Sequence, residues 1–189
     1  MKPRVAISLA LAALALLGTT LLPRVDAALV RDVEGCPGSG NVPSSDDLTT
    51  PRVAILCLLN KERARYGLPA LRQNAVLELA SQRHSEDMGA RNFFEHDTPE
   101  GVDPSTRTHA AGYAAVGVYV GENIYWGEES LATPVKAVEG WMDSPGHREN
   151  ILRPQFTEVG VGVGLDAPRP GGHGRSAVYT TDFGGPSTP

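Results

Sequence analysis

The sequence lacks the signatures of several common enzyme classes. It contains no HExxH motif, which excludes the helix geometry of many zinc proteases, and no GxSxG motif, which excludes the nucleophile elbow of an α/β hydrolase. It also has no glycine-rich phosphate loop, no heptad pattern and no internal repeat. Nucleotide binding through such a loop and a fold built from repeats are therefore not expected.

Basic charge is also scarce. The formal net charge is −5, and no basic stripe of the kind that nucleic-acid binding requires is present. An acidic chain does not dock tightly on an anionic lipid surface either. We therefore expect no nucleic-acid partner. Nothing in the sequence indicates an obligate interface, and we expect a monomer.

Only one segment is long and apolar enough to cross a membrane, and it lies at the N-terminus. The run from Val5 to Leu22 follows Lys2 and Arg4 and precedes small residues at Val25-Asp26-Ala27. This pattern is typical of an export signal, here residues 1–27. A retained anchor is the alternative, because 18 residues are near the lower limit for a membrane span. We favour cleavage, which predicts a secreted, extracellular protein without stable membrane insertion.

Cysteine is limited to Cys36 and Cys57. In an exported protein an even pair is most simply a disulfide, here between a Gly/Pro/Ser-rich segment and the first predicted helix. A buried free thiol at Cys57 with a reactive Cys36 is the alternative. We favour the disulfide. No third cysteine is available for a metal cluster.

The length of 189 residues supports one domain with its own core. Residues 28–49 contain several structure breakers and no periodicity, and we predict that they form a flexible leader. The folded domain is predicted over residues 50–185, with a short tail at 186–189.

Helical patterns fill the first part of this domain. Thr50-Pro51 opens a helix that Gly67 closes. One face of this helix carries Val53, Leu56, Leu59 and Arg63, with Ile55 and Leu58 beside it. Asn74 is a good N-cap for a second helix that should end near Arg91. His84 falls on the apolar face of that helix, and we interpret it as a core histidine that holds a backbone carbonyl rather than as a ligand.

A third helix opens at Thr133-Pro134, and Ser144-Pro145-Gly146 ends it sharply. His147 then begins a short element of sequence HRENIL. A histidine directly after a Pro-Gly turn is held by local backbone geometry, as binding and catalytic groups often are.

The C-terminal third changes to a period of two. Valines at 159, 161 and 163 alternate with glycines, so one face of this strand is aliphatic and the other is bare backbone that a neighbour can approach closely. Residues 177–183 form a second strand, and the two make an antiparallel hairpin with a long turn. A further extended piece is predicted near Gly117–Gly121. Helices followed by strands indicate an α+β fold with an antiparallel sheet.

Several segments together resemble a known family. The runs are NKERARYGLPAL, LELASQRHSEDM, FFEH, GENIYWG, AVEGWMDSPGHRENIL, FTEVGVGV and YTTDFG. In this order they resemble a bacterial secreted CAP-superfamily (SCP-like) domain over residues 50 to 184. The superfamily also contains plant pathogenesis-related proteins, insect venom allergens and animal cysteine-rich secretory proteins. The resemblance implies a three-layer α-β-α sandwich with a small antiparallel sheet.

The resemblance also implies a central cavity with two histidines and two glutamates. His96, Glu122 and His147 match three of these residues, whereas the second glutamate falls on Ser144. Serine is a poor ligand for a divalent ion, and the adjacent Asp143 should point to another side of its helix. Two imidazoles and one carboxylate suit zinc better than calcium. The same set also occurs as a hydrogen-bonded network without metal.

Two functions are open at this point. The first is an extracellular ligand- or metal-binding module whose cavity holds a lipid or a peptide. The aromatic residues near the cavity are Tyr113, Tyr119, Tyr125, Trp126 and Trp141. The alternative is a metal-assisted, peptidase-like hydrolase with Glu122 as candidate base and zinc on His96 and His147. A serine–histidine pair of Ser144 and His147 is disfavoured, because no orienting carboxylate is evident.

Overall fold

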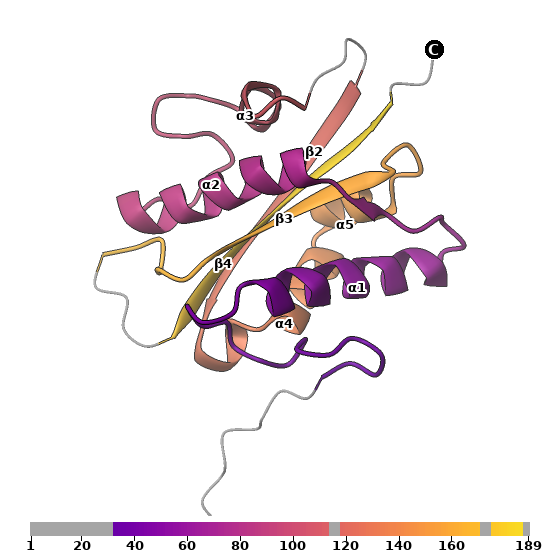
Figure 1. The fold of residues 1–189 in the computed structure, drawn as a ribbon, viewed down its shortest axis with the longest axis horizontal. Helices are drawn as coiled ribbons and strands as arrows, with labels where there is room; N and C mark the ends of the chain where they lie inside the picture. Colours follow the sequence, from indigo (N-terminus) through magenta and orange to yellow (C-terminus); the bar gives the residue numbers. More distant parts are fainter. Residues whose placement is uncertain (1–31, 114–117, 171–174, 187–189) are drawn as a thin grey trace, which may run out of the picture.

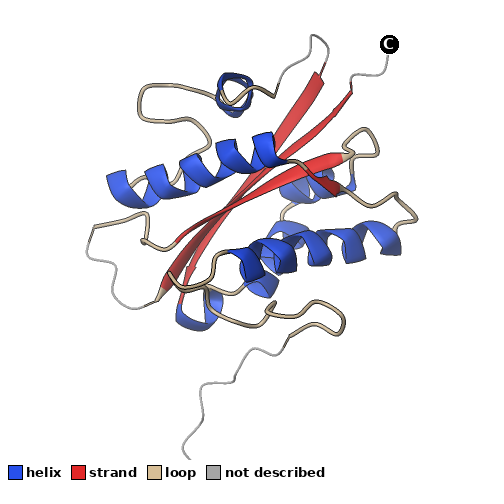
Figure 2. Cartoon of the chain, viewed as in Figure 1, coloured by secondary structure: helices blue, strands red, loops and turns tan. Residues whose placement is uncertain are grey.

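The computed structural model describes residues 32–113, 118–170 and 175–186, and it forms an α-β-α sandwich (Figures 1 and 2). Its elements are α1 (Thr49–Arg65), β1 (Arg72–Gln73), α2 (Ala75–Arg91), α3 (Pro104–Ala110), β2 (Val118–Glu128), η1 (Glu129–Leu131), α4 (Pro134–Asp143), α5 (Pro145–Leu152), β3 (Glu158–Gly164) and β4 (Ser176–Pro186). Helix α2 packs on one side of the sheet and α1, α4 and α5 on the other. The predicted fold class is confirmed. The predicted export signal, residues 1–27, lies outside the described residues.

The sheet has the strand order β1-β3-β4-β2. The predicted hairpin of β3 and β4 is confirmed, and β4 also pairs antiparallel with β2. Strand β2 was expected only as a short extended piece near Gly117–Gly121, but it continues to Glu128. Three elements were not predicted: the two-residue strand β1, which pairs parallel with β3, the short helix α3 and the 3-10 helix η1.

Glycine determines how closely α2 approaches the sheet. A Cβ atom at Gly160 would lie 2.0 Å from the backbone nitrogen of Glu78, and one at Gly162 would lie 2.2 Å from the carbonyl oxygen of Ser81. Helix α2 therefore rests directly on the backbone of β3. The predicted bare face of this strand is confirmed.

The main core lies on the opposite side of the sheet. The valines of β3 pack there with large side chains from α1, α4, α5 and β4. The largest fully buried members are Trp141, Tyr179, Phe156, Phe183, Ile55 and Leu59. The indole N–H of Trp141 donates to the carbonyl oxygen of Ile124 at 2.9 Å, so the core helix α4 is tied to β2.

Helix α2 begins and ends where its capping residues predicted. The Asn74 side chain accepts hydrogen bonds from the backbone N–H groups of Val76 and Leu77, and Asn92 ends the helix in the left-handed conformation. The predicted face of α1 is wrong at Val53, which is exposed, whereas Leu59 and Arg63 are buried together with Ala54, Ile55 and Leu58. Two residues along a helix correspond to a rotation of about 200°, so Val53 and Ile55 cannot share a face.

The segment before α1 packs against the domain. Cys36 and Ser39 are fully buried, and the Asp32 carboxylate accepts hydrogen bonds from the backbone N–H groups of Gly38 and Gly40. The predicted disulfide is confirmed, with Cys36 and Cys57 joined at a Cα–Cα distance of 5.7 Å. A flexible leader is therefore the wrong description for residues 32–48, because burial, hydrogen bonds and the disulfide fix them.

Candidate ligand site at the edge of strand β2

The loop after α2 carries His96 to the edge of the sheet. Phe93 and Phe94 pack against a small cluster that includes Met88 and Ile124, which holds the start of this loop over β2. Nε2 of His84 lies 3.0 Å from the carbonyl oxygen of Glu95, the residue before His96. His84 is fully buried, so its predicted role as a core histidine that holds a backbone carbonyl is confirmed.

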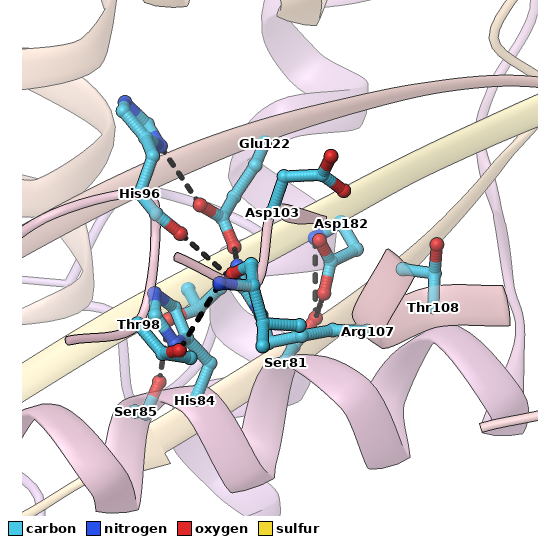
Figure 3. A network of polar contacts seen from close by, with 12 residues as sticks. Ser81, His84, Ser85, His96, Thr98, Asp103, Arg107, Thr108, Glu122 and Asp182 are labelled. Atoms are coloured by element: carbon cyan, nitrogen blue, oxygen red, sulfur yellow. Dashed lines mark hydrogen bonds and ion pairs between the residues drawn. The ribbon is translucent and has the colours of Figure 1, made fainter. Parts of the chain in front are cut away.

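Glu122 comes from the middle of β2 and is almost completely buried, with 1% of its side chain exposed. Its Oε1 atom lies 2.8 Å from Nδ1 of His96, and its Oε2 atom accepts a hydrogen bond from the Arg107 guanidinium at 2.5 Å (Figure 3). Buried charges are stable only when they are paired and hydrogen-bonded. Both oxygens of this carboxylate are therefore committed to side chains of the protein.

Arg107 is the functional residue that sequence reasoning missed. It lies on α3, whose first turn is capped by the Asp103 carboxylate through the backbone N–H of Thr106. Its guanidinium also donates to the carbonyl oxygens of His96, at 2.7 Å, and Val102, at 2.9 Å. The helix is short and has no apolar period. The Asp-Pro start, an N-cap followed by proline at the first helical position, was the signal that could have revealed it.

His147 reaches the same edge from the first turns of α5. The Asn123 side chain donates to the carbonyl oxygen of His147, and the Asn150 side chain donates to the carbonyl oxygen of Glu122. The two asparagines are also bonded to each other. As a result, the imidazole of His147 lies beside that of His96, with 6.2 Å between the ring centroids. The structure thus brings His96, Glu122 and His147 together.

The fourth position of the expected cavity has no carboxylate. Ser144 lies between α4 and α5, where its backbone N–H donates to Trp141 and its carbonyl oxygen accepts from Arg148. Asp143 is exposed and lines a different hollow, together with Val33 and residues of α1. Ser144 therefore connects two helices, and Asp143 lines a hollow to which His96, Glu122 and His147 do not belong.

The two histidines differ electrostatically. The hydrogen bond to Glu122 is the main cause that raises the pKa of His96 above its ordinary value. Burial, and then the charge of His96, lower the pKa of His147. His96 is bonded through Nδ1, and its other ring nitrogen points away from the polar network (Figure 3). Its side chain is 48% exposed, so Nε2 is available to a ligand.

A second carboxyl group lies behind the first. Asp182 of β4 is the cross-strand neighbour of Glu122 and is fully buried. It accepts a hydrogen bond from the Ser81 hydroxyl at 2.7 Å, and its own backbone N–H donates to that hydroxyl (Figure 3). Burial and the negative charge of Glu122 raise the pKa of Asp182 well above its ordinary value. The surroundings of this inner carboxyl group therefore favour its protonated form.

The arrangement does not fit a zinc ion held by two imidazoles and a carboxylate. No group of three His, Cys, Asp or Glu side chains in the described part of the chain is arranged to hold a metal ion. The reason is visible at Glu122, whose oxygens are taken by His96 and Arg107. The imidazoles of His96 and His147 alone fall short of the three or four protein ligands typical of zinc sites.

A hollow of about 410 Å³ adjoins His96. It is lined by Phe93, Glu95, His96, Asp97, Thr98 and Pro99. A larger hollow of about 510 Å³ lies between residues 38–51 and residues 129–133, and none of the predicted site residues lines it. The space beside His96 therefore combines room for a ligand with an imidazole group.

Comparison with known proteins decides the family. The model of the cysteine-rich secretory protein family, CAP, matches residues 56–181. The chain belongs to the CAP family. Among solved structures, this CAP domain is similar to an extracellular protein containing an SCP domain from Bacillus anthracis, with 31% identity and a TM-score of 0.57 over 71% of this chain and 39% of that one. An outer surface protein from Borrelia burgdorferi shares the fold at 18% identity, with a TM-score of 0.62 over 75% of this chain and 96% of that one.

Curated relatives are themselves without an assigned activity. The uncharacterized protein YkwD of Bacillus subtilis strain 168 is 38% identical over 108 residues, which are 57% of this chain and 40% of that protein. The uncharacterized membrane protein YlbC of the same strain is 34% identical over 115 residues, 61% of this chain and 32% of that protein. The chain thus spans well under half the length of these relatives. Among the described residues of this CAP domain, no helix has the length and apolarity to cross a membrane.

Proposed function

We propose that this CAP domain is a secreted binding module that holds its ligand on the open side of His96 and His147. The supporting observation is the pair of His96 and Glu122, which fixes one imidazole through Nδ1 and leaves Nε2 free beside a second imidazole. The similar proteins from B. anthracis and B. burgdorferi are extracellular and outer surface proteins. The export-type N-terminus and the disulfide are consistent with the same location.

The lining of the hollow beside His96 favours a polar peptide over a lipid. Carboxylates of Glu95 and Asp97 and the hydroxyl of Thr98 share this space with Phe93 and Pro99. A lipid tail would remove those polar groups from water without replacing their hydrogen bonds, which is costly. A peptide supplies N–H donors for the carboxylates and, when the imidazole is protonated, carbonyl acceptors for its N–H.

The test selects peptides from a random display library on the purified protein and measures their affinity by calorimetry. Selected peptides should bind the wild type, lose affinity for the His96→Ala/His147→Ala variant and keep it for His109→Ala. His109 is an exposed histidine of α3 outside the site and is the matched control. Equal affinity for the wild type and the double variant would discard the proposal.

A second candidate function is hydrolysis with His96 as the base. The observation that favours it is the carboxylate–imidazole pair, in which Glu122 orients the ring and stabilises its protonated form. In this candidate the base is His96 and not Glu122, which was expected as the base, because both oxygens of Glu122 are already bonded to His96 and Arg107. Nε2 of His96 would accept the proton of an attacking water. A panel of peptide and ester substrates tests this: turnover should vanish in His96→Ala, and its absence from the wild type leaves binding as the function.

A further inference from the structure

The guanidinium of Arg107 occupies the position beside Glu122 where a cation would have to bind. Its terminal nitrogen is 2.5 Å from Oε2 of Glu122, and only 11% of its side chain is exposed. The carboxylate is therefore neutralised by a charge that belongs to the chain itself. Figure 3 shows the three groups in sequence, with Glu122 between the His96 ring and Arg107.

This cation is fixed in place. Two further hydrogen bonds run from the Arg107 guanidinium to the carbonyl oxygens of His96 and Val102, which belong to the loop that forms the site. Breaking a buried ion pair by removing one partner is strongly unfavourable, because the other charge is left uncompensated. An incoming divalent ion would have to displace Arg107 or tolerate its repulsion at close range.

We propose that Arg107 is the specificity-determining residue of this site and excludes divalent metal ions from Glu122. The site then accepts organic ligands that hydrogen-bond to the two imidazoles, and metal binding plays no part in it. This inference uses the cleft of the proposed function and adds the reason why its ligand is not a metal ion. It follows that zinc meets only His96 and His147 in the wild type, and that Glu122 is not one of its ligands.

The experiment measures zinc binding by calorimetry near neutral pH. Wild type and Glu122→Gln should both bind zinc weakly. Arg107→Gln should bind about 10- to 100-fold more tightly, the range by which single ligands and their partners change metal affinity. The control is Arg65→Gln, which removes an exposed arginine of α1 and should match the wild type. Circular dichroism shows whether each variant is folded.

Two results would overturn the inference. One is tight zinc binding by the wild type that falls by much more than about 100-fold in Glu122→Gln, since that loss exceeds what a hydrogen-bond partner of His96 contributes and Glu122 would then be a ligand despite Arg107. The other is a folded Arg107→Gln variant with no gain in affinity. If Arg107→Gln does not fold, the comparison of wild type with Glu122→Gln decides alone. Peptide binding by the wild type tests the proposed function separately, because it needs no variant at Arg107.

Discussion

Nδ1 of His96 lies 2.8 Å from Oε1 of Glu122, a carboxylate whose side chain is 1% exposed. His147, whose ring lies beside that of His96, has its pKa lowered mainly by burial. Two neighbouring imidazoles therefore have pKa values shifted in opposite directions, a pattern common where one fold separates the roles of two titratable groups.

The first prediction concerns the pH at which these rings lose their protons. NMR titration of the ring protons should give a pKa for His96 above, and for His147 below, the ordinary histidine value of about 6.5. In Glu122→Gln the pKa of His96 should fall, because its carboxylate partner is gone. An unchanged pKa of His96 in that variant would contradict the hydrogen bond as its cause.

The same shift has a consequence for stability. Because the pKa of His96 is raised in the folded state, the bond to Glu122 stabilises the fold fully below the unfolded-state pKa of about 6.5. This contribution is lost as the pH rises through the folded-state pKa of His96. In Glu122→Gln, the pH dependence of the urea midpoint should flatten in this window.

The second prediction concerns the contact of β3 with α2. In Gly162→Ala the new Cβ would lie 2.2 Å from the backbone carbonyl oxygen of Ser81, and backbone cannot move aside cheaply. We expect a loss of about 1–3 kcal/mol in the free energy of unfolding, the usual cost of overpacking, measured by urea denaturation. The control is Gly146→Ala in α5, where no atom lies within 4 Å of the new Cβ. Equal stability of the two variants would contradict the close contact.

Much of the fold could be predicted because its signals are local. Asn74 and Asn92 bound α2 through capping geometry, and the alternating glycines of β3 predicted its bare face. Helix α3 was missed because its seven residues have no apolar periodicity, which left the Asp-Pro start as its one local signal. The face of α1 was misassigned at Val53, because two offset apolar stripes fit that helix and only tertiary packing selects one.

The candidate site was only partly predictable for a related reason. Family motifs indicated His96, Glu122 and His147, and the structure places them together. The role of Arg107 could not be predicted from the sequence, because it depends on a contact between α3 and β2 with Glu122, 15 residues further along the chain. Asp182 appeared as an ordinary strand residue, and its burial behind Glu122 follows from a register that only the assembled sheet fixes. The chemistry of the site depends on these two residues.

The third prediction concerns Asp182. The pKa of Asp182 is raised in the folded state. Above the ordinary pKa of about 3.9, the unfolded chain therefore releases this proton more readily than the folded protein does. The folded state loses stability as the pH rises for that reason. Asp182→Asn removes this cost while its amide oxygen still accepts from Ser81. The urea midpoint of the variant should exceed that of the wild type at neutral pH, and the difference should disappear below about pH 3.9.

The matched control, Asp103→Asn, should change the stability of the fold in the opposite direction. The pKa of Asp103, the cap of α3, is lowered mainly by the backbone N–H of Thr106, so its ionised form stabilises the fold. Asp103→Asn should therefore lose a little stability at neutral pH, where Asp182→Asn gains it. Lower stability of Asp182→Asn at neutral pH would show that an ionised Asp182 stabilises the fold.

The last prediction concerns Arg63, which is 1% exposed although it lies on the apolar face of α1. Its guanidinium donates to the carbonyl oxygens of Pro69, Ile151, Arg153 and Phe156. It thereby ties α1 to the end of α5 and to the segment that enters β3. A lysine keeps the charge but has a single nitrogen, which cannot reach carbonyls on all sides of the planar guanidinium. Arg63→Lys should leave buried acceptors unpaired and lower the free energy of unfolding by about 2–4 kcal/mol.

The control is the same substitution at Arg65, two residues further along α1. Its side chain is 67% exposed and pairs with Glu62 on the surface, so Arg65→Lys should change the free energy of unfolding by no more than about 0.5 kcal/mol. Urea denaturation of both variants under identical conditions gives the comparison. Equal stability of the two would mean that water or backbone movement satisfies the carbonyls that Arg63 now bonds. A large difference would instead identify the guanidinium geometry, rather than its charge, as what holds the end of α5 near the site.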